Sequence, residues 1–451
     1  MTTDRNARRH GQSPRAADDA GADTRTDGQK DRDRILYTSA YRRLAGVTQV
    51  VGAVEGHVFH NRLTHTGEVA QIARRLAERF ARQYDKALVH HALWIDPDVA
   101  EAAAMAHDLG HPPFGHVAEH ELDRLTTATG GYEGNAQSFR ILTVLAHHRP
   151  GYRGLNLSRA TLNAVLKYPW FRENGDAKKP GKFGAYLTEQ KDFDFAREGH
   201  GDQSPSLEAQ IMDHADAVAY SVHDLDDFYR VGLIPLQEVA QDFSGHVASF
   251  IAAGRIDVTL IEPHRTDLER WFGLRFNRGR FVGDRVQRAA LRELTASLIH
   301  DFVMEAGLEL ATGAPKVRIP DLRTVQIAFL QHLVWRYVID SPRLASQQWG
   351  QRRIIRQLFE IYREVINDEK EAERIVPGAF LLSALDTILC AILDTILSAH
   401  YSSYREGISC TMAVADRCLP GFRLWEIRPL RMPDALQCET GGRRAQNHSR
   451  K

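Results

Sequence analysis

Residues 106–116, AHDLGHPPFGH, gather three histidines and one aspartate into a short stretch. Imidazole nitrogens and carboxylate oxygens are the groups with which proteins hold divalent metal ions. His107 and Asp108 are adjacent, and adjacent residues on a helix point about 100° apart, so both can face one ion only where the helix is ending. The two following prolines forbid its continuation, and Gly110 suits a left-handed residue after its end. The stretch therefore predicts part of a metal site.

Two ligands make a weak site, and the sequence offers two partners for them. His65 lies in NRLTHTGEVA, and Asp216 lies in MDHADAVAYSVHDLDD. Two imidazoles and two carboxylates suit Mn²⁺, Mg²⁺, Fe²⁺ or Zn²⁺, and they leave coordination positions for water and phosphate. Taken alone, each of the two residues is more often a capping or surface group, so these residues by themselves leave the site open.

The predicted helix that carries Asp216 has a second feature on its polar face. Such a face is usually just solvated. Here a tyrosine lies among the acids at helical spacing, which is typical of a cleft that binds a sugar. The face consists of Asp213, Asp216, Tyr220, Asp224 and Asp227.

The elements that must position these residues are mainly helical, because apolar residues recur at helical spacing through most of the chain. Asp96 and Pro97 mark the start of a helix that we expect to run to Leu109. Residues 174–201 predict a long loop, and Lys316 to Ile319 is at best a short strand. Further helical segments are expected over residues 69–80, 205–230, 284–310, 322–339 and 346–367.

The composition is that of an ordinary globular protein, with 43% apolar and 26% charged residues. Lys and Arg balance Asp and Glu, 58 against 58, so a global attraction for nucleic acid is not expected. The four cysteines lack CxxC spacing and predict neither a zinc knuckle nor disulfides, which favours a reducing cytoplasm. No apolar stretch predicts a membrane span, and residues 1–33 are polar enough to predict a disordered tail.

Six short stretches carry a resemblance to a known family: YRRLAGVTQV (41–50), HNRLTHTGEV (60–69), AHDLGHPPFGH (106–116), GYEGNAQSFR (131–140), LKYPW (166–170) and HADAVAYSVHDLDD (214–227). Together they resemble the HD superfamily of metal-dependent phosphohydrolases, and more narrowly the deoxyguanosine triphosphate triphosphohydrolase family. The resemblance implies an all-α fold with an HD core over residues 34–230 and little or no sheet. It further implies a helical part over 231–400 that completes the nucleotide pocket and the oligomer interface, and an atypical tail over 401–451.

By this resemblance the metal ligands are His65, His107, Asp108 and Asp216. Mn²⁺ or Mg²⁺ is the expected ion, with Fe²⁺ or Zn²⁺ as alternatives. The implied reaction is hydrolysis of a deoxynucleoside triphosphate, by default dGTP, at the α-phosphorus, which releases the deoxynucleoside and tripolyphosphate. The resemblance also implies a homo-oligomer. No Walker A pattern occurs, so P-loop chemistry is not expected.

The resemblance also assigns residues around the substrate. His116 matches a histidine near the α-phosphorus and Glu119 its partner carboxylate, which a spacing of three places beside it on a helix. Without the family, these two would be interpreted as a surface pair. The remaining assignments are phosphate binding for Arg62 and, more weakly, Lys167 and Lys182, a base or sugar contact for Gln49, and deoxyribose contacts for Tyr220 and Asp224. His111 is grouped with the catalytic residues as a side chain that lines the cleft.

Three features depart from the family. Gly134 stands where several relatives have a histidine that is a candidate for protonating the leaving 5′-oxygen, so His116 is the candidate for both proton transfers. Ala217 replaces a second aspartate after Asp216. Residues 401–423, YSSYREGISCTMAVADRCLPGFR, do not resemble the family's Gly-Met-Thr-Asp-like ending. This last departure puts oligomer assembly and part of the base pocket in question.

Two alternatives stay open. The first keeps the HD class but changes the reaction to that of a nucleotide phosphodiesterase or a guanosine tetraphosphate hydrolase, although Tyr220 and Asp224 favour a deoxyribose. The second is a regulatory protein that binds single-stranded nucleic acid and has a vestigial site. It is motivated by residues 270–288, RWFGLRFNRGRFVGDRVQR, which interleave arginines with aromatic residues. A packed helix end with a basic rim is the simpler interpretation of that stretch.

Overall fold

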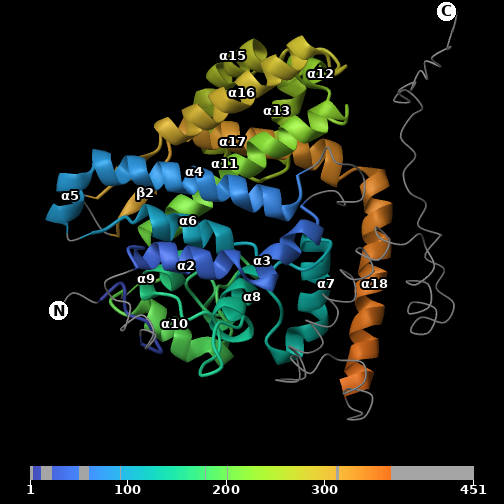
Figure 1. The fold of residues 1–451 in the computed structure, drawn as a ribbon. Helices are drawn as coiled ribbons and strands as arrows, with labels where there is room; N and C mark the ends of the chain where they lie inside the picture. Colours follow the sequence, from blue (N-terminus) through green and yellow to red (C-terminus); the bar gives the residue numbers. More distant parts are fainter. Residues whose placement is uncertain are drawn as a thin grey trace, which may run out of the picture.

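The computed structural model describes residues 4–11, 23–49, 60–91, 93–177, 179–200, 202–310 and 314–366. Within these residues the only strands are a short antiparallel hairpin, β1 (Gly307–Glu309) and β2 (Lys316–Arg318), which pairs Leu308 with Val317. The rest of the regular structure is helical (Figure 1). The predicted all-α class is therefore confirmed, together with the short strand near residue 316.

Three helices form the centre of the molecule: α4 (Arg62–Gln83), α6 (Pro97–Ala106) and α11 (Leu207–Arg230). Each begins at a side chain that accepts hydrogen bonds from the first turn, which satisfies otherwise unpaired backbone N–H groups. α6 packs against both α4 and α11. Its buried side chains include five alanines, whose small size lets the neighbouring helices approach closely.

The other helices surround this centre. Their bounds are α2 (Asp27–Leu36), α3 (Ser39–Arg43), α5 (Asp85–His90), α7 (His116–Thr126), α8 (Gly134–Arg140), α9 (Arg159–Val165), α10 (Gln190–Arg197), α12 (Leu236–Gln241), α13 (Phe243–Ala252), α14 (Val258–Ile261), α15 (Arg265–Phe276), α16 (Arg285–Met304), α17 (Asp321–Val334) and α18 (Pro342–Ile366). Two π-helical turns, Ile141–Leu145 and Trp335–Ile339, extend α8 and α17. None of the described helices combines the length and apolar character that a bilayer crossing requires.

The later helices form two groups around the centre. α12, α13, α15, α16 and α17 gather above α11 in Figure 1, and α17 and α16 pack directly on α11. α18 instead runs beside α7 at the right of the view. An apolar cluster joins these two helices and consists of Ala118, Leu122, Tyr132, Ile355, Leu358, Phe359 and Tyr362. The predictions for residues 367–451 lie outside the described residues.

The predicted disorder of residues 1–33 is wrong for the parts that the structure describes. α2 begins at Asp27 inside this range. Arg8, which precedes α2 in the chain, forms an ion pair with Asp31 on that helix, and both side chains are buried. Composition suggested disorder because large apolar side chains are scarce here. In place of apolar contacts, a buried, hydrogen-bonded ion pair joins residue 8 to α2.

One further sequence prediction needs correction, and one alternative loses the feature that motivated it. The long loop predicted over residues 174–201 contains the helix α10, with Ala196 and Arg197 buried. The aromatic residues of the 270–288 stretch lie mainly inside the core, where Trp271, Phe272 and Phe276 are buried. These rings are not free to stack on bases, so the feature that motivated single-stranded nucleic-acid binding is explained by packing.

Candidate metal centre and acid–base pair

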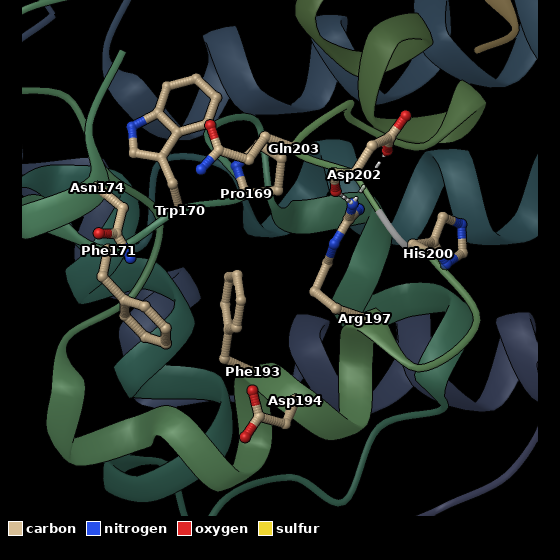
Figure 2. Close-up of a pocket in the computed structure, with 10 residues that line it drawn as sticks. All are labelled: Pro169, Trp170, Phe171, Asn174, Phe193, Asp194, Arg197, His200, Asp202 and Gln203. Atoms are coloured by element: carbon tan, nitrogen blue, oxygen red, sulfur yellow. Dashed lines mark hydrogen bonds and ion pairs between the residues drawn. The ribbon is translucent and has the colours of Figure 1, made fainter. Parts of the chain in front are cut away.

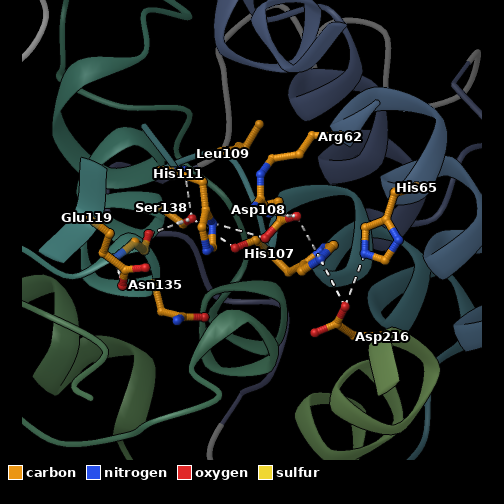
Figure 3. Close-up of polar contacts among 12 residues, drawn as sticks. Arg62, His65, His107, Asp108, Leu109, His111, Glu119, Asn135, Ser138 and Asp216 are labelled. Atoms are coloured by element: carbon orange, nitrogen blue, oxygen red, sulfur yellow. Dashed lines mark hydrogen bonds and ion pairs between the residues drawn. The ribbon is translucent and has the colours of Figure 1, made fainter. Parts of the chain in front are cut away.

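The four predicted metal ligands come together from three elements (Figure 3). His65 lies on α4, His107 and Asp108 follow the end of α6, and Asp216 lies on α11. His65 Nε2 is 3.1 Å from Asp216 Oδ1, and His107 Nε2 is 3.7 Å from the same oxygen. Ligand atoms of His65, His107 and Asp108 lie within 4.8 Å of one another. One ion could therefore contact all four side chains.

The hydrogen bonding of His107 fits a metal ligand. Its Nδ1 lies 2.6 Å from the carbonyl oxygen of Ala104, to which it donates, so the lone pair is on Nε2. Nε2 is buried, faces the other ligands and has no hydrogen-bond partner. A buried acceptor without a partner is costly in a folded protein. A divalent cation among two imidazoles and two carboxylates would satisfy it.

The carboxylates of the centre are held in their charged forms. Burial alone would raise the pKa of Asp108, but Arg62, His107 and His111 lower it well below its usual value. Burial likewise opposes ionisation of Asp216, and Lys167 with the two histidine ligands lowers its pKa. Both residues therefore present anionic oxygens, as cation binding requires.

The turn after α6 holds His107 and Asp108 in place. α6 ends at Ala106, earlier than the predicted Leu109, and Gly110 does not adopt the predicted left-handed conformation. Residue 110 must instead be a glycine because the backbone of Gly134 packs closely against it. A Cβ at residue 110 would lie 2.2 Å from the carbonyl oxygen of Gly134. The turn is pinned by Ser138 Oγ, which accepts from the N–H of Gly110 at 2.8 Å and donates to the carbonyl oxygen of His107 at 3.0 Å.

Gly110→Ala is expected to destabilise the protein by about 3 kcal/mol, because the methyl group meets backbone atoms that cannot move aside. Thermal and chemical unfolding measure this change. Gly67→Ala on α4 is the matched control, because no atom lies within 4 Å of its Cβ. Removing a helical glycine there stabilises by about 0.5–1 kcal/mol. Equal stability of the two variants would contradict the close approach at Gly110.

A histidine and a carboxylate stand together beside the centre. α7 begins at His116, after the left-handed Phe114 and Gly115. His116 Nδ1 lies 2.7 Å from Glu119 Oε2, which is the contact that the spacing predicted. The Glu119 side chain is buried while that of His116 is 65% exposed, so Nε2 of His116 faces outward. Their roles as an acid–base pair stay a prediction.

His111 lies between the centre and the pair. Its Nδ1 is 3.0 Å from Asp108 Oδ1. Burial and the neighbouring Arg62 lower the pKa of His111 to about 4, so its ring is neutral near pH 7. A Cβ at residue 134 would lie 3.0 Å from His111 Cε1, so Gly134 leaves the room that this ring occupies.

The basic residues predicted to bind phosphate all border this region. Arg62 is buried and forms an ion pair with Asp108. Lys167 Nζ lies 2.6 Å from Asp213 Oδ1 and 3.2 Å from Asp216 Oδ2. Lys182 instead contacts Glu119 and a second carboxylate that the sequence interpretation missed, Glu133.

The residues predicted to contact base and sugar lie on neighbouring turns. Tyr220 and Asp224 follow Asp216 along α11, one and two turns on. Asp224 is buried, its Oδ2 has no hydrogen-bond partner, and burial together with Asp227 raises its pKa well above its usual value. Gln49 is half-buried close to the start of α7, and its Oε1 also has no partner. Their contacts with substrate stay predictions.

Sequence reasoning missed the residues that support this site. Tyr132 donates from its hydroxyl to the carbonyl oxygen of Gly110 at 2.6 Å, and Ser138 and Glu133 act as described above. All three lie in GYEGNAQSFR, which matched the family as a block. The contacts that these three residues make could not be predicted without knowing where α8 packs.

A separate pocket of about 400 Å³ lies beside α10 (Figure 2). Trp170, Phe171 and Phe193 form aromatic walls, and Arg197 donates to the carbonyl oxygen of Asp202 at 2.6 Å. None of the predicted site residues lines it. The pocket is therefore distinct from the metal centre.

Comparison with known proteins identifies the family of this chain. The model of the HD domain family matches residues 62–221, which include all four candidate ligands. A deoxyguanosinetriphosphate triphosphohydrolase-like protein of Corynebacterium glutamicum strain R is 35% identical over 368 residues, which cover 76% of this chain and 81% of the relative. This chain belongs to the deoxyguanosinetriphosphate triphosphohydrolase-like family.

Other members of the deoxyguanosinetriphosphate triphosphohydrolase-like family show the same relationship. The Streptomyces coelicolor protein is 37% identical over 360 residues, which cover 74% of this chain and 81% of the relative. A Vibrio cholerae protein is 42% identical over 231 residues, about half of each chain. Membership identifies the chain as an HD-domain hydrolase that uses a divalent metal ion.

Proposed function

We propose that this hydrolase cleaves a deoxynucleoside triphosphate at the α-phosphorus and releases the deoxynucleoside and tripolyphosphate. The convergence of the four ligands, with the His116–Glu119 pair beside them, carries this proposal. The names of the relatives make dGTP the first substrate to test. A cytoplasmic location, homo-oligomer assembly and a contribution of residues 231–400 to the nucleotide pocket stay predictions.

The residues of the centre would hold a divalent ion, which polarises phosphoryl oxygens and lowers the pKa of bound water. Mn²⁺ or Mg²⁺ is proposed, because the donor set mixes imidazole and carboxylate. Arg62 and Lys167 supply fixed positive charge at the same place, which favours a polyphosphate. Water attacks the α-phosphorus, a new P–O bond forms, and the bond from phosphorus to the 5′-oxygen breaks.

His116 is proposed to move the protons of this reaction. Its Nδ1–H donates to Glu119, so Nε2 is the atom that exchanges a proton with the substrate. The imidazolium gives that proton to the leaving 5′-oxygen, and the proton lost by water restores it. Asp224, with a buried oxygen that lacks a partner, is proposed to meet the 3′-hydroxyl, while the ring of Tyr220 packs on the deoxyribose.

An activity screen tests the proposal. Purified protein is incubated with each of the four dNTPs and the four ribonucleotides, with Mn²⁺ or Mg²⁺, and the products are separated by ion-exchange chromatography. Tripolyphosphate and a deoxynucleoside in equal amounts are the expected products. Release of monophosphate and pyrophosphate would point to another HD reaction. No turnover of any dNTP, alone or with a second nucleotide present, would refute the assignment.

A further inference from the structure

Lys182 lies between two buried carboxylates. Its Nζ donates to Glu119 Oε1 at 3.0 Å and to Glu133 Oε1 at 2.9 Å. The side chains of Glu119 and Glu133 are 6% and 2% exposed, whereas the side chain of Lys182 is 33% exposed. The ammonium therefore closes over two acids from the solvent side, and hydrogen bonds to charged groups of this kind are strong.

Glu133 is itself rigidly held. It is the N-cap of α8, and its Oε2 accepts from the backbone N–H groups of Asn135 and Ala136, the latter at 3.0 Å. Glu119 Oε1 also accepts from the N–H of Gly134 at 3.3 Å. A continuous chain of hydrogen bonds thus runs from the start of α8 through Lys182 and Glu119 to His116.

The backbone of Lys182 is fixed as well. Its carbonyl oxygen accepts from Trp170 Nε1 at 2.7 Å, and the next residue, Phe183, is buried in an aromatic cluster with Trp170 and Tyr168. A lysine on such an anchored segment needs little further ordering to hold its ammonium in place. This distinguishes Lys182 from a surface lysine such as Lys179, which lies three residues earlier and is exposed.

We propose that Lys182 is a positioning residue, which keeps the carboxylate of Glu119 ionised and directed at Nδ1 of His116. This inference rests on the proposed acid–base role of that pair. This role differs from the phosphate binding that the resemblance implies for Lys182, and the kinetic test below separates the two roles. The hydrogen bond to Glu133 fixes the position of the Lys182 ammonium.

The charged groups around Glu119 support this role. The titratable groups that face Glu119 are His116 on its own helix, His111 from the turn after α6, which is neutral near pH 7, Lys182, and Glu133 from the start of α8. Burial alone would raise the pKa of Glu119, but His116, His111 and Lys182 together lower it well below its usual value. Burial opposes the charge of Lys182 too, and Glu133 with Glu119 raises its pKa.

Lys182→Met is expected to lower kcat by about 10- to 100-fold, as part of the 10²–10⁴ that general acid–base catalysis contributes. KM should change less than threefold or so. Loss of the ammonium raises the pKa of Glu119, so the acid limb of the kcat profile moves to higher pH. Lys182→Arg keeps the charge and is expected to restore the profile. Lys179→Met removes a lysine from the same segment and should change neither parameter.

A second measurement does not depend on turnover. With ¹³C-labelled glutamate, the carboxyl resonance that disappears in Glu119→Gln belongs to Glu119. In the native protein it should report an ionised carboxylate down to the acid limit of folding, and in Lys182→Met its titration should enter the accessible range. Lys182→Gln, which keeps hydrogen-bond donors but no charge, provides the same test if the methionine variant does not fold.

Two results would overturn the inference. One is a large rise in KM with kcat and the acid limb unchanged, which is the behaviour of a phosphate ligand. The other is an unaltered titration of Glu119 in both neutral variants. If the native protein hydrolyses no dNTP, the proposed function fails, while the glutamate titration still decides whether Lys182 controls Glu119.

Discussion

Asp216→Asn is expected to remove the metal ion and at least about 10³-fold of the hydrolytic rate, since metal catalysis supplies several kcal/mol and each tenfold in rate corresponds to about 1.4 kcal/mol. Asp216 Oδ1 lies within 3.1 Å of His65 Nε2 and 3.7 Å of His107 Nε2, so the substitution withdraws an anionic oxygen from the middle of the cluster. Metal content after dialysis and tripolyphosphate release are measured on the same sample.

The neighbouring acid on α11 provides the control for this experiment. Asp213 contacts the same lysine as Asp216, with its Oδ1 2.6 Å from Lys167 Nζ, but it is not among the predicted ligands. Asp213→Asn should therefore retain the metal and most of the activity. If Asp216→Asn bound metal at the native stoichiometry, or if both variants lost it equally, the ligand assignment would be wrong.

His116→Ala is expected to lower kcat by about 10²–10⁴-fold while the metal content stays unchanged. The reason is geometric: Glu119 Oε2 lies 2.7 Å from Nδ1 of His116, which leaves Nε2 on the exposed side as the atom proposed to exchange a proton with the substrate. Steady-state kinetics and metal analysis of the same preparation separate this effect from loss of the ion.

His120→Ala tests whether the effect is specific. His120 lies one turn further along α7 and is also exposed, so its removal changes the helix surface in a similar way. It should retain native kcat. A His116→Ala enzyme within threefold or so of native kcat would show that another group moves the proton, and His111, whose ring packs against Gly134, would be the next residue to change.

The sequence predicts the central helices well because strong local signals mark them. Asp96 and Pro97 mark the start of α6, and apolar residues recur at helical spacing along α11. The ligand set could be named only because the motifs match a family. Neither His65 nor Asp216 differs by itself from an ordinary helical residue, and only the fold brings them to the turn after α6.

The remaining parts depend on contacts between distant segments, which a local pattern does not record. Arg8 meets Asp31 inside a stretch whose composition indicates disorder. Ser138 holds the turn at Gly110, 28 positions earlier in the chain. Residues 270–288 alternate aromatic and basic residues, as surfaces that bind nucleic acid do. Only the tertiary packing shows that most of these rings are buried.

The run of alanines in α6 has a consequence for how variation is tolerated. Ala100, Ala102, Ala103, Ala104 and Ala106 are all inaccessible to solvent. Interhelical distances of about 8–10 Å depend on the size of the side chains at the contact. A single added methylene here would push apart the helices that carry His65 and Asp216. In a saturation-mutagenesis experiment, these alanine positions should therefore tolerate few substitutions. They lie before His107 in the chain, and none of them takes part in chemistry.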